Sequence, residues 1–148
     1  MPHLTILYTA NLDRPAEQGG TDIQALCAVL AETMIAQRDE AGRAVFPVGG
    51  VRVLAFPASH YAVADRGAAG RAAGGTGEYA FVYLNLRMAR GRSGEVHEAV
   101  GRALDQKIKR HFEPLLASSH IGITLQIDEG PEVVSWRNSS LHPLFERG

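Results

Sequence analysis

Cysteine is nearly absent from this chain, because Cys27 is the only one in 148 residues. A single thiol cannot build an intramolecular disulfide framework or a zinc site made of several thiolates, and it suits a reducing compartment. Cys27 shares helical spacing with apolar neighbours. We therefore interpret it as a small core residue.

An excess of charge of either sign is also lacking. Fifteen Lys and Arg residues stand against sixteen Asp and Glu residues, for a formal net charge of −1. The chain therefore has no cationic field that would attract nucleic acid or anionic lipid. The first residues carry no secretory signal pattern, and no later apolar run is long enough to span a bilayer. We expect a cytoplasmic protein that binds neither nucleic acid nor membrane.

The usual cofactor motifs are missing as well. The six histidines show no ligand spacing such as HExxH, which argues against a metal site. The glycines at 70, 74, 75 and 77 do not form a phosphate-binding fingerprint between a strand and a helix. We expect no cofactor and no metal, so any anionic ligand must be met by locally placed arginines.

Apolar residues make up 45% of the chain, enough for one compact domain over residues 1–148. Residues 3–9 predict a buried strand that begins almost at the first residue. Thr21 and Gln24 match a capping box, and the apolar residues around them recur at helical spacing: Ile23, Leu26, Cys27, Leu30 and Met34. Residues 51–56 predict a second, short strand.

The second half of the chain repeats the order strand, helix, strand. Residues 79–88 are the longest strand candidate, and residues 121–128 supply the last strand. Between them, Ser93 is the expected N-cap of a helix, and Pro114 is expected to kink or end it. The apolar face of this helix consists of Val96, Val100, Ala103, Leu104, Ile108, Phe112 and Leu115.

The two halves predict a two-layer α/β (α+β) domain. We expect pseudo-repeats at about 1–60 and 79–130, each a right-handed parallel β-α-β crossover, sharing a four-stranded sheet with two helices on one face. Residues 61–78, rich in alanine and glycine, predict an exposed, mobile loop between the halves. Several strands are apolar on both sides, so we expect the bare sheet face to contact other subunits.

Pro2 directly follows the initiator methionine. A small second residue commonly permits removal of that methionine, which would leave a secondary amine at the start of a buried strand. Most prolines at this position do nothing catalytic, but the strand would fix this amine in space. An α-amino group titrates near pH ~8, so nearby cations or burial can leave it free to act as a base.

Two arginines are candidate anion ligands. Arg52 follows two glycines in an apolar strand, where its guanidinium must reach an edge, join a structural ion pair or meet an anion. Arg92 immediately precedes the Ser93 cap, so Arg92 and the helix amino terminus would face one carboxylate, with Arg90 as the alternative surface neighbour. Such arginines can bind carboxylates through paired hydrogen bonds and stabilise an enolate oxygen as a proton moves.

Aromatic residues offer weaker candidates. Tyr8 and Tyr83 would line a pocket or, more commonly for strand aromatics, belong to the core. Residues 131–148 follow the last strand and have little periodicity, so we interpret them as an oligomerisation segment. Trp136 and Asn138 would lie in that subunit contact.

Four segments carry a family resemblance: MPH at the start, FPVGGVR around Arg52, YAFVYLNLRMARGRS through Arg92, and SWRNSSLHPLF near the end. In order and spacing they resemble the 5-carboxymethyl-2-hydroxymuconate isomerase family of the tautomerase superfamily. Members of that family resemble bacterial enzymes of homoprotocatechuate breakdown, a branch of aromatic catabolism. The resemblance implies a tautomerase-like fold, a homotrimer, and an isomerase that uses no metal or organic cofactor.

Carried over by motif, the resemblance implies that Pro2 is the proton-transferring base. It implies that Arg52 and Arg92 bind the carboxylates and the 2-oxo group of a small carboxylated substrate, and His3 matches the motif beside Pro2. Two other functions stay open. One is a different reaction of the superfamily, dehalogenation or decarboxylation, and the other is a noncatalytic small-molecule-binding domain.

Overall fold

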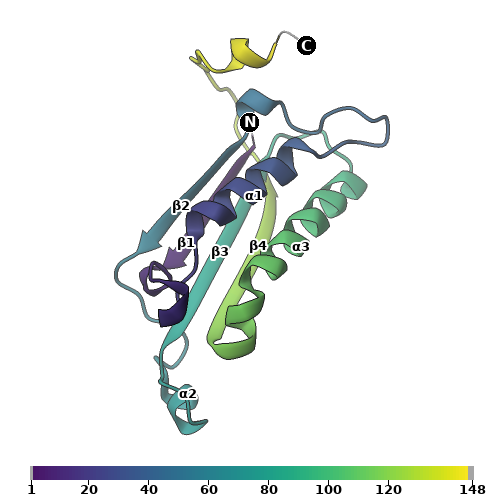
Figure 1. The fold of residues 1–148 in the computed structure, drawn as a ribbon. Helices are drawn as coiled ribbons and strands as arrows, with labels where there is room; N and C mark the ends of the chain where they lie inside the picture. Colours follow the sequence, from purple (N-terminus) through teal and green to yellow (C-terminus); the bar gives the residue numbers. More distant parts are fainter. Residues whose placement is uncertain (1, 147–148) are drawn as a thin grey trace.

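Two strand–helix–strand units build one four-stranded sheet in the computed structural model, which describes residues 2–146 (Figure 1). The first unit consists of β1 (His3–Thr9), α1 (Ile23–Ile35) and β2 (Arg52–Ala58), and the second of β3 (Tyr79–Met88), α3 (Gly94–Ser118) and β4 (His120–Glu129). The sheet order is β2-β1-β3-β4. Strands within each unit are parallel, and the units meet through the antiparallel pair β1 and β3. The predicted two-layer fold is confirmed.

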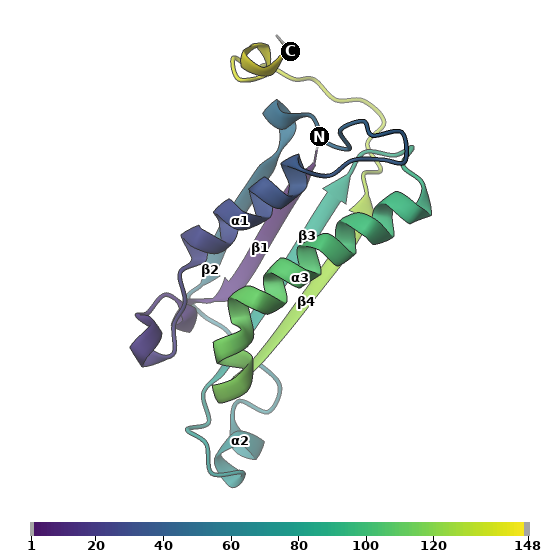
Figure 2. The ribbon, with the colours of Figure 1, turned by 45° about the vertical axis from the view of Figure 1, so that its right-hand side comes forward.

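The core lies between the sheet and the two long helices. Figure 2 shows α1 and α3 side by side over the same face of the sheet. Side chains of β1 and β3 alternate, so that Leu4, Ile6, Val82 and Leu84 are almost fully buried. The helices contribute apolar residues at helical spacing from their inner faces: Leu26, Leu30 and Met34, and Val100, Leu104, Ile108 and Phe112. Cys27 packs against this core while partly exposed, as predicted.

Among residues 2–146, no helix covers the opposite face of the sheet (Figures 1 and 2). Side chains of the other parity point there, and several are large and apolar: Leu7 is 46% exposed, Leu54 53% and Phe56 49%. Leu7 and Phe56 are neighbours in the β1–β2 register. Apolar residues exposed at this level on adjacent strands form a patch that water solvates poorly.

Helix α1 begins with a different cap from the predicted one. The predicted capping box of Thr21 and Gln24 is wrong, because Asp22 is the N-cap and its Oδ1 accepts the Ala25 N–H at 3.0 Å. The Thr21 hydroxyl instead lies 2.8 Å from Nε2 of His111 on α3. Asp ranks above Thr as an N-cap, and Thr21 thus ties the start of α1 to the second helix.

Helix α3 begins as predicted and ends later. Ser93 Oγ accepts the Val96 N–H at 3.2 Å, which confirms the cap. Of the kink or end predicted at Pro114, the end is wrong, since the helix continues to Ser118. Leu115 buries its side chain in the core and holds the last turn in place. The Ser118 hydroxyl donates to the Pro114 carbonyl at 2.7 Å, which further supports that turn.

The connection between the two units contains regular structure that the sequence did not predict. It contains the short helix α2 (Ala68–Ala72), in which Gly70 is buried. Tyr79 Oη accepts the Gly70 N–H at 3.0 Å, so the start of β3 holds the helix. The predicted loop is mostly exposed, as expected, but it includes this short helix. Within residues 2–146, no helix combines the length and apolar character that crossing a membrane requires.

Candidate active site

The strand directions bring the candidate residues to one end of the sheet. β1 and β2 begin there, and the antiparallel β3 ends there, so that His3 lies beside Arg52 on one side and Arg87 on the other. In Figure 1 the chain's amino terminus, the turn before β2 and the carboxyl-terminal segment all gather at this end, while α2 lies at the other. Residues far apart in sequence therefore share one end.

Pro2 is buried at this end, immediately before β1. Its carbonyl accepts the backbone N–H of Arg52 at 3.3 Å, which extends the β1–β2 pairing by one residue. Its ring lies against the turn η3 (Val48–Gly50), because a Cβ placed on Gly50 would stand 3.6 Å from Pro2 Cδ. The proline nitrogen is therefore held in a fixed position, as a proton shuttle requires.

Arg52 begins β2 and folds its guanidinium back onto the η3 turn. Nη1 donates to the Gly49 carbonyl at 2.6 Å and to the Val51 carbonyl at 3.0 Å. Within residues 2–146 the other two guanidinium nitrogens, Nε and Nη2, have no hydrogen-bond partner. These are the donors that make fork-like contacts with a carboxylate. Of the sequence alternatives, the edge position is the one observed, because Arg52 begins β2 and β2 is an edge strand of the sheet. Its guanidinium is anchored by Nη1 and leaves Nε and Nη2 available.

Arg92 follows β3 and is exposed. Its Nη2 donates to the Val45 carbonyl at 2.6 Å. Val45 begins the segment that continues through η3 to Arg52, so both arginines are fastened to the same stretch of chain. Arg90, the sequence alternative, instead donates to the Gly130 carbonyl at 3.1 Å.

His3 is exposed and shares the bare face of the sheet with its two arginine neighbours. Partial burial lowers the pKa of its imidazole, and the positive charges of Arg52 and Arg87 lower it further. A neutral ring beside two guanidinium groups can accept or donate a hydrogen bond without adding charge.

Sequence reasoning missed one residue at this end, His142 near the carboxyl terminus. It is 7% exposed, and its Nε2 lies within 4 Å of the Cβ position of Gly50 that Pro2 also approaches. Its pKa is lowered by removal from water and then by the charges of Arg137 and Arg52. The motif SWRNSSLHPLF contains it, but no spacing rule connects that motif to the amino terminus.

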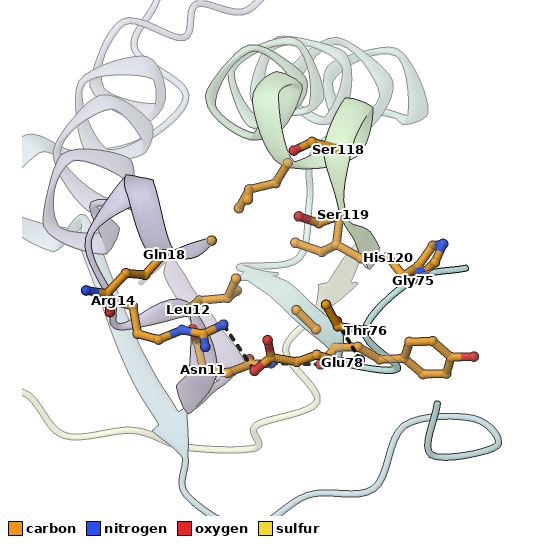
Figure 3. A pocket seen from close by; sticks show the side chains of 15 residues that line it. Asn11, Leu12, Arg14, Gln18, Gly75, Thr76, Glu78, Ser118, Ser119 and His120 are labelled. Atoms are coloured by element: carbon orange, nitrogen blue, oxygen red, sulfur yellow. Dashed lines mark hydrogen bonds and ion pairs between the residues drawn. The ribbon is translucent and has the colours of Figure 1, made fainter. Parts of the chain in front are cut away.

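A separate cleft of about 290 Å³ lies at the opposite end of the sheet. Figure 3 shows its side chains, among which Arg14 and Glu78 form an ion pair at 3.1 Å. Asn11, in the short turn η1 (Ala10–Leu12) after β1, reaches the second unit by donating to the Tyr79 carbonyl at 2.8 Å. These two contacts join the two units, while Asn11 Oδ1 is buried without a hydrogen-bond partner among residues 2–146. The cleft contains none of Pro2, Arg52 and Arg92.

The chemistry available at the Pro2 end is proton transfer next to an anion. A fixed proline amine, once Met1 is removed, can take and return a proton. The anchored guanidinium groups can hold carboxylates and the negative charge that develops on an enolate oxygen. Among residues 2–146, no group of three or more His, Cys, Asp and Glu side chains is arranged to hold a metal ion.

Comparison with known proteins agrees with this fold. A solved 5-carboxymethyl-2-hydroxymuconate delta-isomerase is 51% identical, with a TM-score of 0.93 over 100% of this chain and 95% of its own. The 5-carboxymethyl-2-hydroxymuconate Delta-isomerase of Escherichia coli is 26% identical over 146 residues, covering 99% of this chain and all of that protein.

A more distant likeness concerns the fold alone. The structure of a fused 4-OT, described as a wild-type symmetric trimer, is 19% identical, with a TM-score of 0.51 over 98% of this chain and 99% of its own. It supports the tautomerase-like arrangement of two β-α-β units. The family model described as 5-carboxymethyl-2-hydroxymuconate isomerase matches residues 2–145. With nearly the whole sequence matched and the fold shared, this chain belongs to the 5-carboxymethyl-2-hydroxymuconate isomerase family, whose members are enzymes.

Proposed function

We propose that this enzyme isomerises 5-carboxymethyl-2-hydroxymuconate by moving one proton through the amine of Pro2. The observation that carries the proposal is the meeting of Pro2 with Arg52 and the segment anchored by Arg92 at one end of the sheet. A base beside two carboxylate-binding groups suits a substrate that is both acidic and multiply charged. The named activity of the relatives gives the substrate class.

In this mechanism neutral Pro2 takes the proton of the substrate's 2-hydroxyl group. The oxygen–hydrogen bond breaks, its electrons form the 2-oxo group, and the conjugated double bonds shift along the carbon chain. Pro2 then returns the proton to the distal carbon, so the base is regenerated and no atom is lost. Arg52 and Arg92 hold the carboxylates and share the negative charge of the dienolate.

His3 is the fourth residue of the proposed site. Its ring lies in the same row as Arg52 and Arg87, on the sheet face away from the helices. We assign it a role in binding substrate, since a neutral imidazole there adds a donor without repelling the arginines.

We also propose that the enzyme is one domain that works as a cytoplasmic homotrimer. The exposed apolar residues Leu7, Leu54 and Phe56 on the bare sheet face support a subunit contact there, and residues 131–148 would extend it. The single cysteine supports a reducing compartment such as the cytoplasm.

The test is the ultraviolet absorbance change of 5-carboxymethyl-2-hydroxymuconate when the enzyme is added, with mass spectrometry showing that the chain begins at Pro2. Rapid turnover by the wild type and its loss in Pro2→Ala would support the proposal. Absence of turnover by a correctly processed wild type would contradict it. In that case, turnover of a haloacrylate or a 2-oxo-3-enedioate would identify one of the other superfamily reactions.

A further inference from the structure

The carboxyl-terminal segment packs directly on the turn that holds Pro2. Its last turn, η4 (His142–Phe145), meets η3 with no side chain between them: a Cβ on Gly49 would lie 3.1 Å from His142 Cα and 3.1 Å from Phe145 Cδ2. Figures 1 and 2 both show this segment at the end of the sheet where the amino terminus lies. Two consecutive glycines thus allow His142 to reach the Pro2 site.

Ser139 fixes which ring nitrogen of His142 carries the proton. Ser139 Oγ accepts the backbone N–H groups of Leu141 at 3.1 Å and His142 at 3.2 Å. These two bonds occupy both lone pairs of the hydroxyl oxygen, so its remaining contact, 2.8 Å to Nδ1 of His142, is one in which the hydroxyl donates. Nδ1 is then the acceptor, and the proton of a neutral ring resides on Nε2.

That Nε2–H group is buried and has no hydrogen-bond partner within residues 2–146. Buried polar groups in folded proteins are nearly always paired, so an unpaired donor indicates a group that meets a partner from outside the chain. Nε2 stands 3.8 Å from the Cβ position of Gly50, and Pro2 Cδ, bonded to the proline nitrogen, stands 3.6 Å from the same point. The missing side chain of Gly50 leaves a gap that both groups border.

We propose that His142 is a catalytic residue whose Nε2–H donates to the oxygen on C2 of the substrate. This inference rests on the proposed proton transfer through Pro2. When Pro2 removes the hydroxyl proton, negative charge develops on that oxygen, and a donor bordering the same gap stabilises it. Arg52 and Arg92 still hold the carboxylates, and His142 adds a donor directed at the reacting oxygen itself.

The charges around His142 suit a neutral donor. Arg137 and Arg52 oppose protonation of its ring, while Glu146 favours it, and removal from water outweighs that carboxylate in lowering the pKa. The imidazole thus stays neutral at neutral pH. It has one N–H to donate as a hydrogen bond, and it lacks the second, acidic proton of an imidazolium that could be transferred to the substrate in place of the proton on Pro2.

The first test compares two variants that differ in where they place an amide. In His142→Asn the side chain reaches the Nδ1 position and the Ser139 contact but not the Nε2 position, whereas in His142→Gln an N–H reaches the Nε2 position. We expect His142→Asn to lower kcat by about 10²-fold, the usual cost of one oxyanion donor. We expect His142→Gln to restore activity to within about tenfold of wild type, with KM changing little in either variant.

The matched control is His60→Asn, which changes an exposed histidine in the connection to the second unit whose ring contacts Ser59. It should turn over at the wild-type rate. Wild-type kcat in folded His142→Asn, or equal losses in the Asn and Gln variants, would overturn the role of His142. The Pro2 mechanism is tested separately by Pro2→Ala. If Pro2→Ala loses turnover while the His142 variants do not behave as expected, the Pro2 proposal stands and only the role of His142 fails.

A second measurement does not depend on turnover or on a variant that folds. Nitrogen-15 spectra of the imidazole rings in the wild type report the protonated nitrogen directly. We expect the proton of His142 on Nε2 between pH 6 and 8, and a shift of that resonance when 2-oxoadipate, a stable 2-oxo dicarboxylate, saturates the site. A proton on Nδ1, or a resonance unmoved at saturation, would contradict the proposal.

Discussion

At the scale of single residues, Gly50 links three parts of the site. A Cβ there would lie 3.2 Å from Pro47 Cγ and would enter the gap bordered by Pro2 and His142. We expect Gly50→Ala to lower kcat by about 10- to 100-fold, since small displacements of reacting groups are costly. The unfolding free energy should fall by about 1 kcal/mol from overpacking.

Gly94→Ala is the control for this change, because a Cβ on Gly94, the first residue of α3, meets nothing within 4 Å. It should leave kcat unchanged and raise the unfolding free energy by up to about 1 kcal/mol. Steady-state kinetics and denaturant titrations measure both effects. Equal kcat in the two variants would show that the gap at Gly50 has no role in turnover.

The two arginines give a second prediction at this scale. Removing either guanidinium by Arg52→Ala or Arg92→Ala should lower kcat/KM by about 10²-fold or more, as for other groups that stabilise charge in the transition state. Arg110→Ala, on an exposed position of α3, is the matched control. If all three variants keep wild-type kcat/KM, the arginines are structural rather than substrate ligands.

Sequence reasoning could propose only part of this candidate site. Three candidates could be proposed from residue type and local motif alone: Pro2, Arg52 and Arg92. His142 could not, because its proximity to Pro2 depends on a tertiary contact between η3 and η4, which no local spacing encodes. Its tautomer depends further on Ser139, whose two backbone contacts arise only once η4 has formed.

At the scale of elements, strands were more predictable than helix ends. β1 and β3 have their predicted bounds. β2 begins one residue later and ends two residues later than predicted, and β4 gains one residue at each end. Alternating apolar residues define such strands locally. The helix ends depended on tertiary contacts instead: Thr21 bonds His111 across the helix pair, which frees Asp22 to cap α1.

At the scale of elements, Pro114 within α3 gives a prediction about helix stability. It lies exposed within α3, lacks the N–H that would bond the Arg110 carbonyl, and is tolerated because the last turn is anchored by Leu115. Pro114→Ala should therefore raise the unfolding free energy by about 1 to 3 kcal/mol. Glu113→Ala, its exposed neighbour, should change it by less than about 0.5 kcal/mol. A less stable Pro114→Ala in thermal or denaturant melts would mean that the ring itself packs against something essential.

At the scale of the whole molecule, the bare sheet face governs assembly in our proposal. Phe56 on this face and Leu116 on the outer side of α3 are both 49% exposed. Phe56→Glu should convert the trimer to monomers, because a buried, unpaired carboxylate at an interface is strongly unfavourable. Leu116→Glu should leave the trimer intact. Sedimentation velocity distinguishes the outcomes, and a trimer that survives Phe56→Glu would move the interface to another surface.

The central claim is that Pro2 carries the proton on its nitrogen, which is basic only when Pro2 is the first residue of the chain. The most direct measurement compares turnover of 5-carboxymethyl-2-hydroxymuconate by the chain that begins at Pro2 with turnover by a chain that keeps one residue before it. Both have the same side chains in the site, but in the longer chain the proline nitrogen is an amide without basicity. We predict a loss of kcat of at least about 10²-fold, the lower range for a general base. Equal turnover by the two chains would contradict the account.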